Sequence, residues 1–216
     1  MGQKINPNIL RLGVLTTWSS RWFNERTYKD IVIEDYRLRN LLMDRLKVAG
    51  VSKIEIERSI NNIRVTAYVS RPGIVIGRAG TGLEELKKYI ILHLGVIKKG
   101  KNAPKIDIRV EPVKEPNLDP YLVARNVADQ LAKRLPHKRV LGMSSERVMG
   151  AGAKGVRIVL AGRIAGAEIA RREKIQRGTV PLSTIREDIR YASVPSLTKK
   201  GYIGVKVWIH RAEEKQ

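Results

Sequence analysis

The tetrapeptide Gly77-Arg78-Ala79-Gly80 constrains the fold of this 216-residue chain more than any other feature, because of the segments on either side of it. Pro72 is suited to open a short helical turn over residues 72–76. After the glycines a second helix is expected, with an apolar face formed by Leu83, Leu86, Ile90 and Leu94. The glycines let the backbone approach a phosphodiester closely, and the second helix would turn its free N–H groups toward the phosphate. Standing alone, the same pattern also describes a tight turn between two helices.

The order of the neighbouring elements favours the phosphate-binding interpretation. Apolar residues at helical spacing predict a helix over residues 35–49, which Gly50 ends. Alternating and β-branched residues predict strands over residues 51–57 and 63–69, and a third strand over 105–110. Helix, strand, strand, helix, Gly-x-x-Gly, helix and strand is the order of a type II KH domain. KH modules clamp about four nucleotides of single-stranded RNA at this loop, so the first half of the chain resembles an RNA-binding domain.

Three prolines mark the boundary of this domain, since proline cannot continue a helix or a central strand. They lie within the segment from Glu111 to Pro120. We therefore expect residues 1–16 as an N-terminal tail, 17–111 as the KH domain, 112–120 as a linker and 121–216 as a second domain. The first thirty residues look irregular. In the second domain we expect helices over 121–135 and 136–150, strands over 155–161 and 202–210, and between these a basic arm and an extended stretch near 185–194.

The charge of the chain restricts its function. The chain carries 42 Lys+Arg against 21 Asp+Glu, and a net charge of +21 favours a polyanionic partner. The excess is dense over residues 133–177, where twelve basic residues against three acidic ones give a net of +9. Nucleic acid is the first candidate partner. An anionic membrane is the second, but there is no long apolar run, and Asn6 stands where a myristoylation signal needs Ser or Thr.

Patterns for catalysis, metals and cofactors are absent or fail in their context. The chain has no cysteine, and His93, His137 and His210 lack the spacing of metal ligands. The Gly-x-Gly-x-x-Gly stretch over residues 150–155 follows a helix and precedes a strand, the reverse of a dinucleotide site. The stretch from Gly77 to Gly82 continues with Leu83, where a P-loop has its phosphate-binding lysine followed by the Ser or Thr hydroxyl for Mg²⁺. We expect no enzyme, no catalytic residue, no metal and no cofactor, although sequence alone leaves open an acid–base pair formed in space.

Several short motifs are spread in order over nearly the whole chain. They are Met1-Gly2-Gln3-Lys4 with Pro7 and Arg11-Leu12-Gly13, Ile56-Glu57-Arg58, Ile63-Arg64-Val65-Thr66, Arg71 to Gly77, Gly152-Ala153-Lys154-Gly155, Gly162-Arg163, Gly166 to Arg171, and Gly204 to Ile209. These motifs resemble those of the bacterial family of small-subunit ribosomal proteins numbered three. The resemblance implies an α/β (α+β) fold. Its N-terminal type II KH domain would be followed by a C-terminal α/β domain, with helices packed on a mostly antiparallel sheet.

The resemblance also implies a function and partners. It implies a structural constituent of the head of the small ribosomal subunit, in the cytoplasm, that binds small-subunit rRNA. It further implies a place lining the channel by which mRNA enters, where the family contributes to mRNA positioning and unwinding. The implied neighbours are the proteins numbered four and five at the channel and ten and fourteen in the head. Neither a membrane nor a second copy of the chain is an expected partner.

The family's residues can be placed on this sequence one by one. The loop expected to bind RNA is Gly77, Arg78, Ala79 and Gly80. By position the family's mRNA contacts fall on Lys138, Arg139 and Gly142, and Gly142 departs from the family's basic residue. Candidates for mRNA contact are therefore Arg134, Lys138, Arg139 and Arg147. Candidates for rRNA contact are Lys4, Arg11, Lys154, Arg157, Arg163, Arg171, Arg172, Lys174 and Arg177.

Two other classes of protein compete with this interpretation. One is a nucleic-acid-modifying enzyme, because eukaryotic relatives of the family are linked to DNA lesion cleavage, but the sequence offers no catalytic cluster. The other is a free-standing KH assembly factor or regulator. Such a protein would usually carry a GTPase or transcription-factor module, for which 216 residues leave no room.

Overall fold

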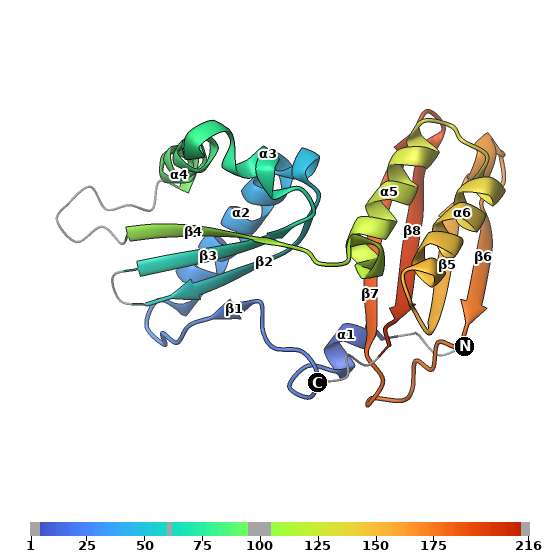
Figure 1. Ribbon diagram of the computed structural model, residues 1–216, viewed down its shortest axis with the longest axis horizontal. Coiled ribbons are helices and arrows are strands. Elements are labelled where there is room, and N and C mark those ends of the chain that lie inside the picture. Colours follow the sequence, from blue (N-terminus) through green and yellow to red (C-terminus); the bar gives the residue numbers. More distant parts are fainter. Residues whose placement is uncertain (1–4, 60–61, 95–104, 213–216) are drawn as a thin grey trace. The chain divides into compact units, whose positions relative to one another are not determined.

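The computed structural model describes residues 5–59, 62–94 and 105–212, and the chain divides into two units (Figure 1). One runs from Trp18 to Lys114, and we call it the inserted unit. The other combines Met1–Thr17 with Glu115–Gln216, and we call it the terminal unit. The chain therefore starts in the terminal unit, passes through the inserted unit and returns.

The inserted unit is built on a four-stranded sheet in the order β1-β2-β3-β4. β2 and β3 pair antiparallel, whereas β1 runs parallel to β2 and β4 runs parallel to β3. The strands are β1 (Ser20–Arg21), β2 (Val51–Arg58), β3 (Asn62–Val69) and β4 (Lys105–Pro112). The helices are α2 (Tyr28–Arg45), α3 (Pro72–Ile76), α4 (Thr81–Leu94) and the 3-10 turns η1 (Lys47–Ala49) and η2 (Arg78–Gly80).

One face of this sheet holds the core and the other is charged. Because side chains alternate along a strand, Ile54 and Ile56 of β2 face inward and Lys53 and Glu55 face outward. The helices α2 and α4 cover the apolar face (Figure 1). The core combines residues of both helices with residues of three strands: Leu38, Leu42, Leu86, Ile90, Ile54, Ile56, Ile63, Val65 and Ile108. This order of strands and helices agrees with the type II KH domain expected from the sequence.

The start of α2 differs from the prediction. The helix begins at Tyr28 and not near residue 35. The periodicity did not reveal its first turns, because Val32 and Ile33 are exposed there and the turns show no apolar face in the sequence. Buried Asp35 fixes this part of the helix: its carboxylate accepts hydrogen bonds from Trp22 Nε1 at 2.8 Å and Arg58 Nε at 2.7 Å. Trp22 lies next to β1, so the segment expected to be irregular is held by a buried, paired carboxylate.

The terminal unit packs two helices on a wholly antiparallel sheet in the order β6-β5-β8-β7, as the fold prediction required (Figure 1). The helices α5 and α6 cover one face, and Val156, Ile158 and Leu160 of β5 lie beneath them in the core. The elements are α1 (Pro7–Leu10), η3 (Pro116–Leu118), α5 (Pro120–Ala132), α6 (His137–Gly150), β5 (Gly155–Gly162), η4 (Ile164–Gly166), β6 (Arg171–Gly178), β7 (Ile189–Thr198) and β8 (Gly201–His210).

The connection between the units is shorter than the linker expected over residues 112–120. Each of its prolines belongs to an element: Pro112 ends β4, Pro116 opens η3, and Pro120 is the first residue of α5. Asp119 caps α5 by accepting hydrogen bonds from the backbone N–H groups of Tyr121 and Leu122. Only residues 113–115 remain between the two sets of elements.

The N-terminal segment is not a separate tail. α1 packs on β7, and the Asn8 side chain both donates to Tyr191 O and accepts from Tyr191 N, at 3.0 Å each. Arg11 is 1% exposed. Its guanidinium donates to the carbonyl oxygens of Glu187 (2.6 Å), Thr184 (2.7 Å), Pro7 (3.1 Å) and Leu182 (3.4 Å). The segment expected as residues 1–16 is therefore joined to the terminal unit, and Arg11 is a structural residue and not an rRNA ligand.

Two further elements of the terminal unit depart from the sequence pattern. The helix expected over residues 121–135 ends at Ala132, because Arg134 adopts the left-handed conformation with φ 61°. Its N–H bonds to Leu131 O at 2.9 Å and the N–H of Leu135 bonds to Gln130 O at 3.2 Å, which is a Schellman helix end. The expected basic arm contains strand β6. This strand lies at the edge of the sheet and is mostly charged, so its sequence does not show the alternation of apolar and polar residues by which strands are predicted.

A polar cluster holds the connection between β6 and β7 against the end of β8. His210 is 3% exposed, with Nδ1 at 2.9 Å from Thr179 O and Nε2 at 2.7 Å from Glu187 Oε2. Both ring nitrogens of His210 thus face an oxygen atom of the connection between β6 and β7. The hydrogen bond from His210, helped by Lys154 at 3.6 Å, holds the pKa of the Glu187 carboxyl below its ordinary value.

We predict that the terminal unit survives a break in the connection. A site-specific protease sequence inserted between Lys114 and Glu115 should yield two fragments that elute together in size-exclusion chromatography, because Asn8 and Arg11 still bind the C-terminal fragment. Arg11→Ala should release them, since it leaves buried carbonyl groups without donors at a cost of about 3 kcal/mol or more. Fragments that separate without the Arg11 change would contradict the assignment of the N-terminal segment.

We predict that Glu187 contributes to stability at neutral pH and not in acid. Its pKa is lowered by folding, so the contribution is present above the unfolded value, near 4.5, and is lost as pH falls through the folded value. Glu187→Gln should therefore flatten the loss of unfolding free energy between about pH 5 and pH 3, as measured by urea denaturation. Exposed Glu168 offers the control: Glu168→Gln should leave the slope unchanged.

Candidate nucleic-acid interface

The Gly77–Gly80 loop is a tight connection between two packed helices. Gly77 ends α3 with φ 70° and ψ −174°, a conformation open in practice only to glycine. Gly82, which the sequence reasoning missed, allows the close approach of α4 to α3, because a Cβ there would lie 2.5 Å from Val75 O. A third glycine within six residues was the signal for this contact. The loop is therefore held rigidly in place by helix packing.

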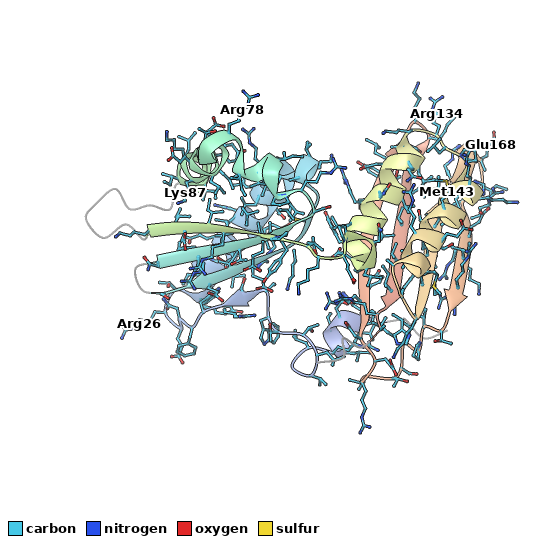
Figure 2. All side chains as sticks on the ribbon, viewed as in Figure 1. Arg26, Arg78, Lys87, Arg134, Met143 and Glu168 are labelled. Atoms are coloured by element: carbon cyan, nitrogen blue, oxygen red, sulfur yellow. The ribbon has the colours of Figure 1, made fainter. Side chains whose placement is uncertain are left out.

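The charge at this loop comes from one exposed arginine. Arg78 extends away from the inserted unit (Figure 2). The first turn of α4 carries Glu84, whose carboxylate competes with an external anion for the same positive helix end. The placement of the loop fits phosphate contact, and its electrostatics support a weak contact.

The start of α6 concentrates positive charge where a helix is least suited to it. Pro136 is the N-cap and provides no side-chain hydrogen bond, and the first turn contains no acidic residue. Lys138 and Arg139 are exposed there and form no ion pair with any described residue. Arg134 lies just before them, exposed at the end of α5 (Figure 2). Three of the four candidates for mRNA contact thus gather at one end of the terminal unit.

Arg147 is separated from this group. It lies in the last turn of α6, where a cation is favoured by the helix dipole. Nine residues of helix place it about 14 Å along the axis from Lys138. Gly142 lies between them on the helix, and a Cβ added at this position would meet nothing within 4 Å.

The candidates for rRNA contact differ in the partners that they have within the chain. Some are paired with carboxylates: Arg177 with Glu146 at 3.0 Å, Arg171 with Glu173 at 3.2 Å, and Lys154 with Glu187 at 3.6 Å. Arg163 donates from Nε to Ala167 O at 2.8 Å, and Arg157 lies over the Trp208 ring at 5.4 Å. Arg172 and Lys174 are exposed and form no ion pair with a described residue. Lys4 lies outside the described residues.

Arg172 and Lys174 belong to the face of the terminal sheet that α5 and α6 leave uncovered. Strand register places Lys174 and Lys206 on either side of Val159. Val180 and Leu182 pack against one end of this face, next to Val159. Lys206 is exposed and was missed by the sequence reasoning, although its alternation with the apolar residues of β8 was the signal. We call Arg172, Lys174 and Lys206 the open basic face.

The geometry shows no pattern for chemistry in the described part of the chain. No three His, Asp or Glu side chains there lie close enough together to hold a metal ion. No helix among the same residues has an apolar stretch long enough to cross a membrane. What the surface offers is exposed positive charge on rigid elements.

Comparison with known proteins identifies the family. Residues 37–118 match the family described as KH domain, and residues 127–209 match the one described as ribosomal protein S3, C-terminal domain. A protein of Thermodesulfovibrio yellowstonii named small ribosomal subunit protein uS3 is 48% identical over 213 residues, which cover 99% of this chain and 95% of the relative. The chain belongs to the uS3 family. Proteins of the same name from Legionella pneumophila and Bacillus cytotoxicus are 45% and 44% identical, each over 99% of this chain and 94% of their own.

Membership in the uS3 family confirms several predictions. The resemblance drawn from the sequence motifs is correct, and so is the fold class. uS3 proteins are constituents of the small ribosomal subunit and not enzymes, which confirms the predicted class and the cytoplasmic, ribosomal location. The contacts that this chain makes with particular RNAs and neighbours remain predictions.

We predict that two substitutions at Gly80 will distinguish a loop that contacts RNA from a loop that is only scaffold. A Cβ at Gly77 would lie 3.1 Å from Gly82 N, whereas a Cβ at Gly80 would meet nothing within 4 Å. Gly80 has φ 81°, which Asn and Asp tolerate better than other residues. Gly80→Asp should bind single-stranded RNA about 3- to 10-fold more weakly than Gly80→Asn at low salt, because the two differ in one charge near a phosphate. Equal affinities by fluorescence anisotropy would show that the loop is scaffold.

Proposed function

We propose that this chain contacts mRNA where it enters the small subunit, through the start of α6, and binds rRNA through its remaining unpaired cations. The observation that carries the proposal is the pair Lys138 and Arg139, exposed in the first turn of α6 without an acidic neighbour in that turn. The resemblance to the family implies mRNA contact at the same positions, which supports the proposal. Contribution to mRNA positioning and unwinding follows as the proposed role.

The helix dipole supplies the physical reason. Cations in the first turn of a helix are disfavoured by about 0.3–1 kcal/mol each when exposed. Lys138 and Arg139 both pay this cost, and no capping side chain or described carboxylate offsets it. An anion from outside the chain removes the penalty, because a phosphate interacts favourably with both the side chains and the helix N-terminus. Such contacts would hold one strand of the mRNA on a fixed helix, and they would therefore oppose its pairing with a second strand.

The open basic face is the corresponding proposal for rRNA. Its three residues, Arg172, Lys174 and Lys206, lie on the strands β6 and β8 that pair with β5 on either side of Val159. They form no ion pair with a carboxylate that the structure describes. Phosphate contacts of this kind position a protein without reading sequence. Arg171, Arg177 and Lys154 are already neutralised by carboxylates, so we assign them a smaller part.

The neighbours implied by the resemblance are part of the same proposal. The proteins numbered four and five would lie beside the start of α6 at the channel, and those numbered ten and fourteen would lie in the head. Exposed apolar side chains on the inserted unit, Trp18 at 68% and Phe23 at 87%, are suited to protein contacts.

We predict that Lys138→Ala with Arg139→Ala slows translation through a stable mRNA hairpin by about 3- to 10-fold, with little effect on an unstructured message. The lost contacts matter only when a duplex must be opened. Single-turnover elongation on matched messages, using subunits of verified composition, is the measurement. Lys87→Ala with Lys88→Ala on α4 is the matched control and should leave both messages unaffected. Equal slowing on both messages, or loss of the protein from the subunit, would refute the mRNA assignment.

The reverse change extends this test. Gly142→Lys restores a basic residue on α6, and the added side chain meets no atom within 4 Å of its Cβ. It should stabilise the helix by about 0.5–1 kcal/mol, because glycine is a poor helix former. Gly142→Lys should also speed translation through the stable mRNA hairpin. Gly142→Ala should stabilise the helix to a similar extent without changing the rate of translation through the hairpin.

A further inference from the structure

A pocket lies at one end of the terminal unit, and its lining comes from three chain connections. The α5–α6 turn, the turn containing η4 and the β7–β8 hairpin enclose a volume of about 420 Å³. This is within the range of sites that hold small ligands. The apolar part of the lining comes chiefly from Leu131, Leu135, Pro136, Ala165 and Ile203.

The polar part of the lining is cationic. Arg134, Arg163, Lys199 and Lys200 surround the pocket, and no acidic residue contributes to it. None of the four forms an ion pair with a residue that the structure describes. His137 also lines the pocket, and its Nε2 lies 2.8 Å from Glu173 Oε2. A ligand with an apolar body and negative charge on either side would complement this lining.

The backbone at the pocket is held in costly conformations. Among the described residues, the non-glycine positions with positive φ are Arg134 at 61° and Ala165 at 56°, and both line the pocket. The left-handed conformation costs free energy for an L-residue, because its Cβ crowds the backbone. Glycine would remove that cost at the Schellman position of Arg134 but would also remove the guanidinium. Strain of this kind gathers at ligand sites, and here it places a cation at the rim.

One of the cations is held before any ligand binds. The Arg163 Nε donates to Ala167 O at 2.8 Å, which fixes the plane of the guanidinium. The stem of the exposed Lys200 side chain lies beside Gly166, where an added Cβ would be 3.5 Å from Lys200 Cγ. A fixed guanidinium plane next to an apolar floor is a surface on which an unstacked base can lie.

We propose that this pocket takes one unstacked nucleotide of an RNA strand, with its base against the apolar floor and its flanking phosphates on the cationic rim. Four cations exceed what one carboxylate of a protein side chain requires, and they suit the successive phosphates of a strand. The pocket residue His137 directly precedes Lys138 and Arg139, so one strand can occupy both sites. The inference rests on the proposed function and adds to it a site that captures a base as a duplex opens.

The experiment uses the absence of cysteine from the chain. Leu135 lines the pocket and is 46% exposed, so Leu135→Cys introduces a single thiol that N-ethylmaleimide can alkylate, filling the pocket without changing charge. Leu15→Cys, at a leucine that is 44% exposed in the same unit, is the matched control. The probes are a 12-nucleotide single-stranded RNA and the same strand with four central abasic residues.

The unsubstituted protein should bind the intact strand about 5- to 30-fold more tightly than the abasic one. Alkylated Leu135→Cys should lose this preference while keeping salt-dependent binding of both strands, and alkylated Leu15→Cys should keep the preference. Lys200→Gln should weaken both strands equally, because it removes a phosphate contact and not a base contact. A preference that is absent before alkylation, or unchanged by it, would overturn the pocket proposal and leave the proposed function standing. No binding of either strand at low salt would refute both.

Discussion

The buried guanidinium of Arg11, which has no carboxylate partner among the described residues, joins the two chain segments that make up the terminal unit. Arg11 is surrounded by four backbone carbonyl groups, contributed by its own helix and by residues 182–187. Burying a charge is tolerable only when its hydrogen bonds are satisfied, and the rigid fork of arginine suits several carbonyl groups at once. Glu187 joins this arrangement to His210 through its side chain and to Arg11 through its carbonyl. The connection between β6 and β7, the end of β8 and the N-terminal segment thus depend on one another.

The distribution of the positive charge follows from this architecture. Two cations within the fold are satisfied by carbonyl groups or carboxylates, Arg11 and Arg58 beside Asp35. The cations at the end of the terminal unit and on the open basic face form no ion pair with a described carboxylate. The net charge of +21 is therefore separated into an internal part that supports the fold and an external part available to RNA. The two kinds cannot be told apart by counting charges.

Periodicity predicted the elements whose stability comes from an apolar face. The strands β2 and β3 and the helix α6 lie close to their expected ranges because burial and spacing agree there. The pattern failed where something other than an apolar face decides the structure: α2 starts early, in the part of the chain held by the Asp35–Arg58 pair, and α5 ends early at the left-handed Arg134. Arg11 was taken for an RNA ligand because charge alone does not show which carbonyl groups will surround it. The pocket was not foreseen, since its three turns meet only after the sheet has formed.

The division of the terminal unit between both ends of the chain has a consequence for the order of events during synthesis. Arg11 and its acceptor Leu182 are 171 positions apart. At a synthesis rate of 5–20 residues per second, roughly 10–35 s pass between the appearance of the two. The inserted unit is complete long before then, because all its strands precede Lys114. Each newly made chain therefore exposes a cationic N-terminal segment beside a finished domain, and an early nucleic-acid contact at that segment must be given up before the second domain can close.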